Sequence, residues 1–201
     1  MELRLATVDD LPALSQTLAR AFDDDPVMQH LFPPGTRSRA SRVARFMALG
    51  TKAAIGDGTA YTTAGLTGGA IWHEPGRWKV PVRETLRDIP EAMRVLGRRA
   101  SVGMATLRAV ESRHPTEPHW YLGILGTEPA EQGNGIGGAL MAPVLERCDT
   151  EGLPAYLESS KERNVPYYER YGFRVTGEVD LPKGGPRVWA MWRDAQPAER
   201  D

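Results

Sequence analysis

Four glycines follow a short apolar run in the middle of the chain and could bind a phosphate. The apolar residues of 120–125, bounded by turn residues, predict a buried strand, and leucine and valine at helical spacing in 139–148 predict a helix. Between them lie Gly133, Gly135, Gly137 and Gly138. A glycine-rich turn from a strand into a helix gathers unpaired backbone N–H groups at the positive helix end, and glycine lets a bulky anion approach closely. The expected ligand is therefore a phosphate or pyrophosphate.

Two known patterns fit this turn. Gly133-x-Gly135-x-x-Gly138 matches the dinucleotide fingerprint, and Glu158 lies 20 residues further on, where a ribose-binding acid is expected. In that fold the glycines follow the strand directly, whereas the residues of 127–132 intervene here. The residues after Glu158 also do not supply the further strand–helix–strand units that the fold needs. A nicotinamide dehydrogenase is therefore the weaker interpretation.

The other pattern is Gln132-x-x-Gly135-x-Gly137, preceded by Thr127-x-Pro129. It resembles the acetyl-CoA loop of the GNAT superfamily of N-acetyltransferases, which reads Gln/Arg-x-x-Gly-x-Gly/Ala. In that family the N–H groups of the loop wrap the CoA pyrophosphate, and the preceding strand pairs with the pantetheine arm. The cosubstrate implied by this resemblance is acetyl-CoA.

A second block strengthens the resemblance. Asn164–Phe173 reads NVPYYERYGF, in which Asn, an aromatic-Tyr pair and Gly-Phe follow the next expected strand, PAYLESS at 154–160. Within the superfamily the chain is most similar to the puromycin N-acetyltransferase group. That similarity depends on HWYLGILGTEPAEQGNG, LESS, NVPYYERYGF, GPRVWAMW and DDDPVMQHLFP, which are spread over nearly the whole chain.

The resemblance implies a fold and a cofactor site. We expect one domain over residues 1–201, with a mixed α/β fold whose twisted, mainly antiparallel sheet is splayed at the central strand and flanked by helices. The backbone of Leu125 and Thr127 is expected to pair with pantetheine, and Asn164 to hold the pantetheine or a phosphate-linked amide. The residues expected to ring the pyrophosphate are Gln132, Gly133, Asn134, Gly135, Gly137 and Gly138. Asn134 departs from the basic residue that many relatives carry, which removes one possible charge contact.

Acetyl transfer from a thioester to an amine requires a neutral amine, a donor for the oxyanion and a proton for the leaving thiolate. Tyr168 holds the Tyr position of the family block and is our candidate general acid, since a phenol pKa near 10 suits delivery to a thiolate; the alternative is a core tyrosine. Its neighbour Tyr167 is expected on the opposite side of the helix. Glu158 is the candidate general base, or a binder of the ammonium cation. His119 is the second candidate, although a surface histidine is the default interpretation of that residue.

The remaining elements follow from periodicity and turn residues. We expect helices over 9–22, with Asp9 as its N-cap, and 37–55, and strands over 59–64, 68–72, 173–178 and 188–192. Asp23–Asp25 is expected to be a solvated helix end, with a cation or basic-substrate site as the alternative. In 80–115, Pro90 and Gly97 are expected to break an insertion into short helices. These helices could cover the acceptor cleft, or form a packing pair or dimer contact.

Composition excludes several classes. Net charge is −1 over 201 residues, so there is no electrostatic case for nucleic acid or an anionic membrane. The single Cys148 excludes an internal disulfide and is expected to be buried in a helix. His73 and Glu74 are adjacent on a strand and point to opposite faces, so no metal site is expected. The absence of a signal peptide and of a long apolar run indicates a cytoplasmic protein.

The expected function is therefore acetyl transfer from acetyl-CoA to the primary amine of a small molecule, with puromycin or a related aminonucleoside as the specific expectation. A protein or peptide N-acetyltransferase and a non-catalytic acyl-CoA sensor are the alternatives. The protein is expected to be a monomer or homodimer. Whether it serves resistance, biosynthesis or another role is left open by the sequence.

Overall fold

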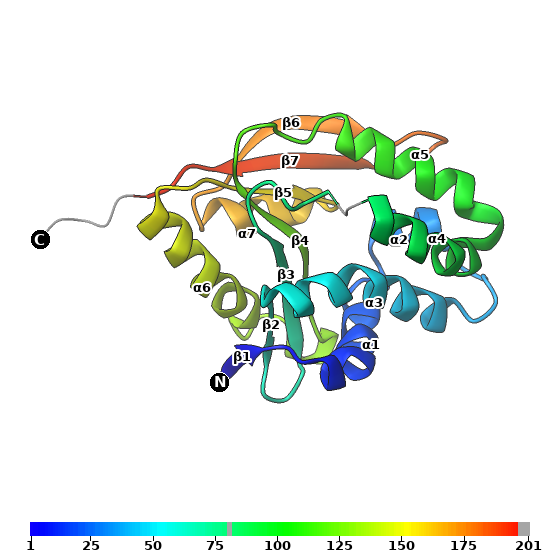
Figure 1. The fold of residues 1–201 in the computed structure, drawn as a ribbon, viewed down its shortest axis with the longest axis horizontal. Helices are drawn as coiled ribbons and strands as arrows, with labels where there is room; N and C mark the ends of the chain where they lie inside the picture. The colour runs from blue at the N-terminus through cyan, green and yellow to red at the C-terminus, as the bar shows by residue number, and fades with distance from the viewer. Residues whose placement is uncertain (80–81, 197–201) are drawn as a thin grey trace, which may run out of the picture.

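The computed structural model describes the backbone of residues 1–79 and 82–196, and their side chains except those of 82–88. Seven strands form one sheet in the order β1-β2-β3-β4-β5-β7-β6 (Figure 1). They are β1 (Leu3–Leu5), β2 (Ala60–Thr63), β3 (Gly68–His73), β4 (Trp120–Thr127), β5 (Ala155–Ser159), β6 (Arg174–Asp180) and β7 (Arg187–Arg193). All neighbours are antiparallel except β4 and β5, which run parallel. The predicted mixed α/β fold with a mainly antiparallel sheet is confirmed.

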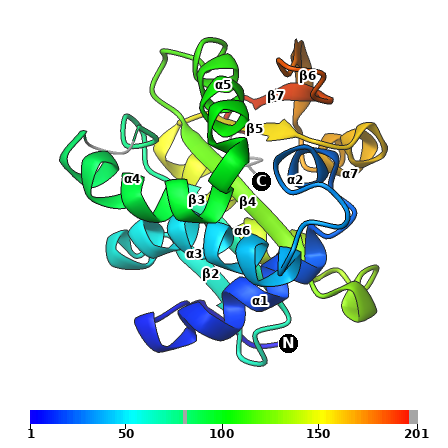
Figure 2. The same ribbon diagram turned by 90° about the vertical axis from the view of Figure 1, so that its right-hand side faces the viewer.

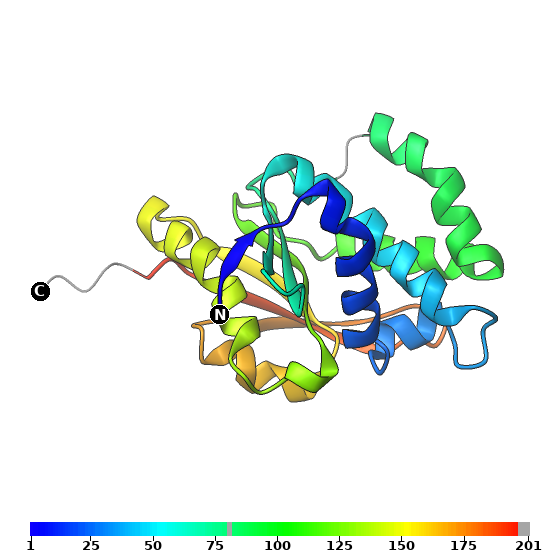
Figure 3. The same ribbon diagram turned by 90° about the horizontal axis from the view of Figure 1, so that it is seen from below.

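Helices cover both faces of this sheet (Figures 2 and 3). They are α1 (Leu11–Ala21), α2 (Pro26–Leu31), α3 (Arg39–Asp57), α4 (Val82–Leu96), α5 (Ala100–Glu111), α6 (Ile136–Glu151) and α7 (Val165–Glu169). The alternation of side chains along β3 divides the core between the two faces. Ile71 packs in one cluster with α1 and α3, while Trp72 packs in a second cluster with α6, which also holds the buried Cys148.

Two glycines let α1 lie close against the sheet. A Cβ atom on Gly69 would come within 3.0 Å of the Leu14 side chain, and one on Gly126 within 2.9 Å of the Leu18 side chain. Both leucines are fully buried. The glycines of β3 and β4 therefore provide the surface on which the apolar stripe of α1 packs.

The sheet opens between its two parallel strands. β4 pairs with β5 only through Trp120–Leu122, opposite Ala155–Leu157. In the ladder with β3, Ile71 pairs with Ile124 and Trp72 with Leu122, so Gly123 is an extra residue, a β-bulge. Past the bulge β4 continues along β3 but diverges from β5. This is the predicted splay at the central strand.

Two local predictions were wrong. Asp9 is not the N-cap of α1: a 3₁₀ turn precedes the helix, and Thr7 caps it in a reciprocal pair with Asp10. Pro90 does not break the insertion, because α4 runs through it; proline has a helix-compatible φ and removes only one donor. The break falls at Gly97, whose φ of +54° lies in the left-handed region, as predicted.

Candidate active site

A cleft of about 940 Å³ extends from the opening between β4 and β5 to the N-terminal ends of α6 and α7. It gathers nine of the residues predicted from sequence. These are Leu125, Thr127, Gln132, Gly133, Gly135, Gly137, Glu158, Asn164 and Tyr168. Asn134 and Gly138 are not among the residues that line it. Segments far apart in the sequence therefore meet at one place.

The free edge of β4 faces this opening. The N–H of Glu128 donates to the carbonyl of Thr67 at 2.8 Å, which fixes the hydrogen-bonded positions of the β3–β4 ladder. Hydrogen-bonded and non-hydrogen-bonded pairs alternate in an antiparallel ladder, so Gly126 bonds to β3 whereas Leu125 and Thr127 direct their backbone groups away from it. The side chain of Gln132 donates to the Thr127 carbonyl at 3.2 Å from that side. Leu125 and Thr127 thus offer a strand edge to an extended ligand.

The glycine loop forms the next wall of the cleft. Gly133 and Gly135 have φ values of +86° and +77°, a region that other residues rarely adopt. Gly135 is the N-cap of α6, so the unpaired N–H groups of the first helical turn are directed toward the cleft. Arg163 and Arg170 also line the cleft and add positive charge. Backbone donors, a helix N-terminus and arginines form a suitable environment for a phosphate.

The last two glycines of the loop are explained by packing. A Cβ atom on Gly137 would come within 2.5 Å of the Tyr167 hydroxyl oxygen, and one on Gly138 within 1.9 Å of the Tyr171 hydroxyl oxygen. These glycines therefore let α6 approach the tyrosines that follow β5. Asn134 is exposed and its amide donates to Glu131 at 3.1 Å, so it lies outside the cleft in this conformation.

Tyr168 is buried beside the cleft. Burial, together with the nearby charge of Asp25, raises the pKa of its phenol well above the usual value near 10. Its ring centroid lies 5.2 Å from that of Tyr167 and 6.1 Å from that of Phe173. Tyr167 lines the same cleft, so the prediction that it packs on the opposite side of its helix was wrong.

The prediction of a solvated helix end holds for Asp23 and Asp24, which are exposed after α1, but it is wrong for Asp25. Asp25 is 2% exposed, caps α2 by accepting from the Met28 N–H at 2.9 Å, and also accepts from the hydroxyl of Ser160. Asp24 forms ion pairs of 2.5 Å with both Lys161 and Arg163. The loop between α1 and α2 is therefore fastened to the segment after β5, at the rim of the cleft.

Glu158 and Tyr168 lie on opposite sides of β5. Leu157 packs in the same core cluster as Tyr168, and successive residues of a strand point to opposite faces, so Glu158 lies on the other face. The Glu158 side chain is 8% exposed and its Oε1 lies 3.5 Å from Nδ1 of His114. A phenol and a carboxylate thus flank the opening between β4 and β5.

His119 is buried, whereas the default interpretation of the sequence was a surface histidine. It is 1% exposed; its Nδ1 lies 2.6 Å from the Glu117 carbonyl oxygen and its Nε2 lies 2.9 Å from Nε2 of His114. Sequence reasoning overlooked His114 altogether. The only signal was the short segment HPTEPH, in which a histidine stands at each end and two prolines restrict the chain between them.

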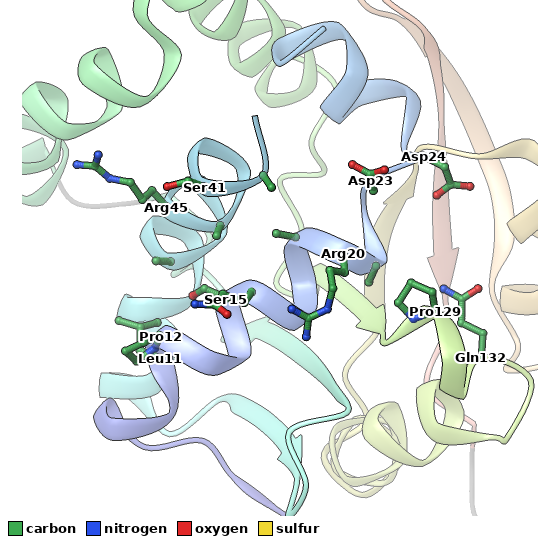
Figure 4. A pocket seen from close by; sticks show the side chains of 16 residues that line it. Leu11, Pro12, Ser15, Arg20, Asp23, Asp24, Ser41, Arg45, Pro129 and Gln132 are labelled. Atoms are coloured by element: carbon green, nitrogen blue, oxygen red, sulfur yellow. The ribbon is translucent and has the colours of Figure 1, made fainter. Parts of the chain in front are cut away.

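A second and larger hollow, of about 1120 Å³, lies between α1 and α3 (Figure 4). Small side chains such as Ala19, Ala44 and Ala48 line much of it. Gln132 lies on its wall together with Asp23 and Asp24, and neither Tyr168 nor Glu158 is among the residues that line it. The smaller cleft, which is lined by Tyr168, Glu158 and the glycine loop, is therefore the candidate active site.

In the described part of the chain, no group of three or more His, Cys, Asp or Glu side chains is arranged to hold a metal ion. None of the helices in 1–79 and 82–196 is both long and apolar enough to cross a membrane.

Comparison with known proteins agrees with this geometry. The chain is 27% identical over 198 residues to an uncharacterized N-acetyltransferase of Schizosaccharomyces pombe, covering 94% of this chain and 80% of that protein. It is 39% identical over 57 residues to the mycothiol acetyltransferase of Brachybacterium faecium, which is 27% of this chain and 17% of that enzyme.

Solved structures share the fold. The crystal structure of a histone acetyltransferase and related acetyltransferase from Corynebacterium glutamicum superposes with a TM-score of 0.73 at 22% identity, covering 99% of this chain and 98% of that one. An N-acetyltransferase from Staphylococcus aureus superposes with a TM-score of 0.65 at 16% identity, covering 96% and 100% of the two chains.

The family pattern itself is matched by residues 70–173, from β3 through the glycine loop to Phe173. This range holds every residue that was predicted from sequence to act in catalysis or to bind acetyl-CoA. It confirms the predicted superfamily and the predicted class of enzyme, an N-acetyltransferase. The chain belongs to the acetyltransferase (GNAT) family.

Proposed function

We propose that the protein transfers the acetyl group of acetyl-CoA directly to the primary amine of a small molecule. The observation that carries this proposal is the single cleft that gathers a free strand edge, a glycine-lined helix N-terminus and a proton donor and acceptor. Family membership supplies the reaction class. The positions of the side chains suggest the individual roles.

Acetyl-CoA would enter with its pyrophosphate on the loop of Gly133 and Gly135 and its pantetheine along the free edge of β4. Leu125 and Thr127 would pair with the pantetheine amides, and Asn164 lines the same cleft. The thioester would then lie in the opening between β4 and β5. Unpaired N–H groups at that edge can donate to the oxyanion, which is often the largest contribution to catalysis of acyl transfer.

Tyr168 and Glu158 would complete the chemistry from the two sides of β5. Glu158 takes a proton from the ammonium of the acceptor, and the resulting amine attacks the thioester carbon. Tyr168 donates its proton to the CoA sulfur as the C–S bond breaks. Because Tyr168 is buried, its phenol remains protonated at neutral pH and is ready to act as an acid.

The acceptor would be an amine with an aromatic or apolar body. The face of the sheet that holds Glu158 carries Tyr121, Tyr156 and Trp192, with ring centroids 6.0 Å apart for the two tyrosines and 6.4 Å apart for Tyr156 and Trp192. Puromycin or a related aminonucleoside is the specific proposal, and its support is the sequence resemblance described above.

The test is thiol release from acetyl-CoA, followed with a thiol-reactive dye, with puromycin, a panel of arylalkyl and aliphatic amines, and a lysine-containing peptide. We expect release with puromycin. Release with other amines only would keep the reaction and reject this acceptor. Release only with the peptide would favour a protein acetyltransferase. Calorimetric binding of acetyl-CoA without release by any acceptor would favour a non-catalytic sensor.

A further inference from the structure

Glu158 lies at one end of a buried chain of polar groups. The mechanism proposed above gives a role to Glu158 but not to the groups behind it. Nδ1 of His114 lies 3.5 Å from Oε1 of Glu158, Nε2 of His114 lies 2.9 Å from Nε2 of His119, and Nδ1 of His119 lies 2.6 Å from the carbonyl oxygen of Glu117. The His114 side chain is 1% exposed. The chain therefore runs from the cleft into the protein interior.

The carbonyl oxygen of Glu117 determines the direction of each hydrogen bond between these polar groups. A carbonyl oxygen only accepts, so Nδ1 of His119 must carry a hydrogen. Burial lowers the pKa of His119, which keeps its ring neutral, and its Nε2 is then an acceptor. Nε2 of His114 must consequently donate to it. In neutral His114 this leaves a lone pair on Nδ1, directed toward Glu158.

That lone pair meets a carboxylate oxygen. Within the described residues, Oε1 of Glu158 is buried and has no hydrogen-bond partner. Two acceptors that face one another in a buried site are unfavourable, and a buried carboxylate oxygen without a donor is costly. One proton between Glu158 and His114 removes both penalties, whether it resides on the carboxyl group or on the imidazole. The geometry thus creates a proton-binding pair.

Among the side chains that the structure describes, those packed around this pair offer no competing proton site. The ring of Trp78 stacks on His114 with centroids 3.6 Å apart, and the rings of Tyr121 and Tyr156 meet it edge to face at 4.8 Å. Burial and the Glu158 charge raise the pKa values of both phenols, so they stay neutral. Other titratable groups among the described side chains nearby are His73, whose pKa is lowered by burial, Lys79, which lies over Trp78 at 4.9 Å, and the exposed Glu117, whose charge acts on His119.

We propose that His114 is a positioning residue that shares a proton with Glu158 and so receives, through that carboxylate, the proton that the acceptor ammonium gives up. His119 acts behind it by fixing the tautomer of His114. This inference depends on the proposed function for its role in catalysis, while the proton-sharing pair itself exists without any substrate.

The reaction releases a proton that Glu158 and His114 can accept. A bound ammonium has three N–H bonds and the amide product has one, so two protons leave nitrogen as the N–C bond forms and the C–S bond breaks. One ends on the CoA sulfur by way of Tyr168. The other goes to the pair of Glu158 and His114 and then to solvent. The pair accepts this proton only after losing its own, so its proton affinity sets the acidic limb of the pH profile.

The first test needs no substrate. Long-range ¹H–¹⁵N spectra of the ¹⁵N-histidine-labelled full chain, recorded across the pH range, report the tautomer of each of the four histidines. We expect His119 to carry its hydrogen on Nδ1, and the ring signals of His114 to change their pH dependence in Glu158→Gln, because the carboxylate that lies 3.5 Å from Nδ1 of His114 is lost. Glu117→Gln, which keeps the backbone carbonyl and changes an exposed carboxylate, is the matched control and should leave His114 unchanged.

Hydrogen on Nε2 of His119 in the wild-type protein would overturn the inference, and so would a His114 titration that is insensitive to Glu158→Gln. The tautomer of the wild-type protein needs no variant, so the test holds even if a substitution prevents folding. Because both readouts are taken without acetyl-CoA or amine, failure of the proposed function leaves them interpretable.

The second test measures turnover. In His114→Gln we expect kcat to fall about tenfold, less than the roughly 10²–10⁴-fold that loss of a general base costs. KM for the amine should remain unchanged, and the acidic limb of kcat should shift, because His114 no longer shares the proton of Glu158. A parallel loss at all pH values, with the limb in place, would show a merely structural role for His114.

Discussion

The hydroxyl of Ser160, directly after β5, donates a hydrogen bond to the carboxylate of Asp25, which lies 135 residues earlier at the start of α2. The same carboxylate accepts from the backbone of Met28. One buried side chain thus holds a helix N-terminus and the rim of the cleft together. Removing the Asp25 side chain should therefore weaken both the start of α2 and the attachment of the cleft rim.

Replacing Asp25 with alanine leaves two donors without a partner in a buried place. Each unsatisfied donor costs about 1–3 kcal/mol, so we expect Asp25→Ala to lower the free energy of unfolding by about 2–5 kcal/mol. Urea denaturation measures this change. Asp23→Ala is the control, because the Asp23 side chain is 71% exposed and its ion pair with Arg39 should contribute little. Equal losses in the two variants would contradict the assignment.

Tyr168→Phe removes the proposed acid and keeps the ring. We expect kcat to fall about 10²-fold or more with acetyl-CoA binding retained, as judged by thiol release and calorimetry. Tyr167→Phe, which changes another phenol on the wall of the same cleft, should have nearly wild-type kcat. Full activity of Tyr168→Phe would remove Tyr168 from the mechanism.

The pH profile provides a separate check on Tyr168. A raised pKa means that the phenol loses its proton only at a pH above its ordinary value of about 10. The acid therefore stays available throughout the neutral and mildly alkaline range, and kcat should not decline between pH 7 and about 10. An alkaline limb near pH 8 that disappears in Tyr168→Phe would show that the phenol is more acidic than its buried position implies.

Gly138→Ala should disturb the packing of α6 on Tyr171. The new Cβ atom would lie 1.9 Å from the Tyr171 hydroxyl oxygen, so the tyrosine must move, and we expect a loss of about 1–3 kcal/mol in urea denaturation. The double variant with Tyr171→Phe removes that oxygen and should recover part of the loss. Gly177→Ala, where a Cβ meets nothing within 4 Å, should be close to neutral. Equal stability of Gly138→Ala and wild type would refute this explanation of the glycine.

Asp149 should contribute stability that depends on pH. Arg193, which is 4% exposed, donates to both carboxylate oxygens of Asp149 at 2.7 Å and thereby lowers the pKa of that group. A lowered folded-state pKa gives stability that is present above the unfolded value of about 3.9 and is lost as pH falls through the folded value. Asp149→Asn should therefore lower stability by about 1–3 kcal/mol at pH 7, and by less below pH 4.

Urea denaturation at both pH values checks this, with Asp180→Asn as the control. The pKa of Asp180 is also lowered, by Arg187, but that pair is exposed and screened by solvent. Its replacement should change little at either pH. A loss from Asp149→Asn that stays constant down to pH 3 would rule out the linkage.

The sequence allowed prediction of those parts of the site that are local. The strand predicted over 120–125, the glycine loop and the helix after it could be recognised because periodicity and glycine spacing are set by neighbours along the chain. Their meeting with Tyr168 followed from the family resemblance, which implied how the blocks assemble.

The parts that were missed depend on contacts between distant segments. His114 and His119 have the composition of a surface loop, and only the fold buries them under Trp78 and beside Tyr156. Gly138 resembled a phosphate-binding glycine until the position of Tyr171 was known. Asp25 looked like one member of a solvated acidic run, because its partner Ser160 lies beyond the reach of any sequence window.

The strand order also has a consequence for synthesis on the ribosome. β7 lies between β5 and β6, although both of them precede it in the chain. While residues 174–180 are emerging, β6 has no neighbour to pair with, and the far edge of β5 stays open until 187–193 arrive. Unpaired edges are templates for aggregation. The nascent chain should therefore depend on chaperones up to that point, and truncation before Arg187 should yield an insoluble product rather than a smaller active domain.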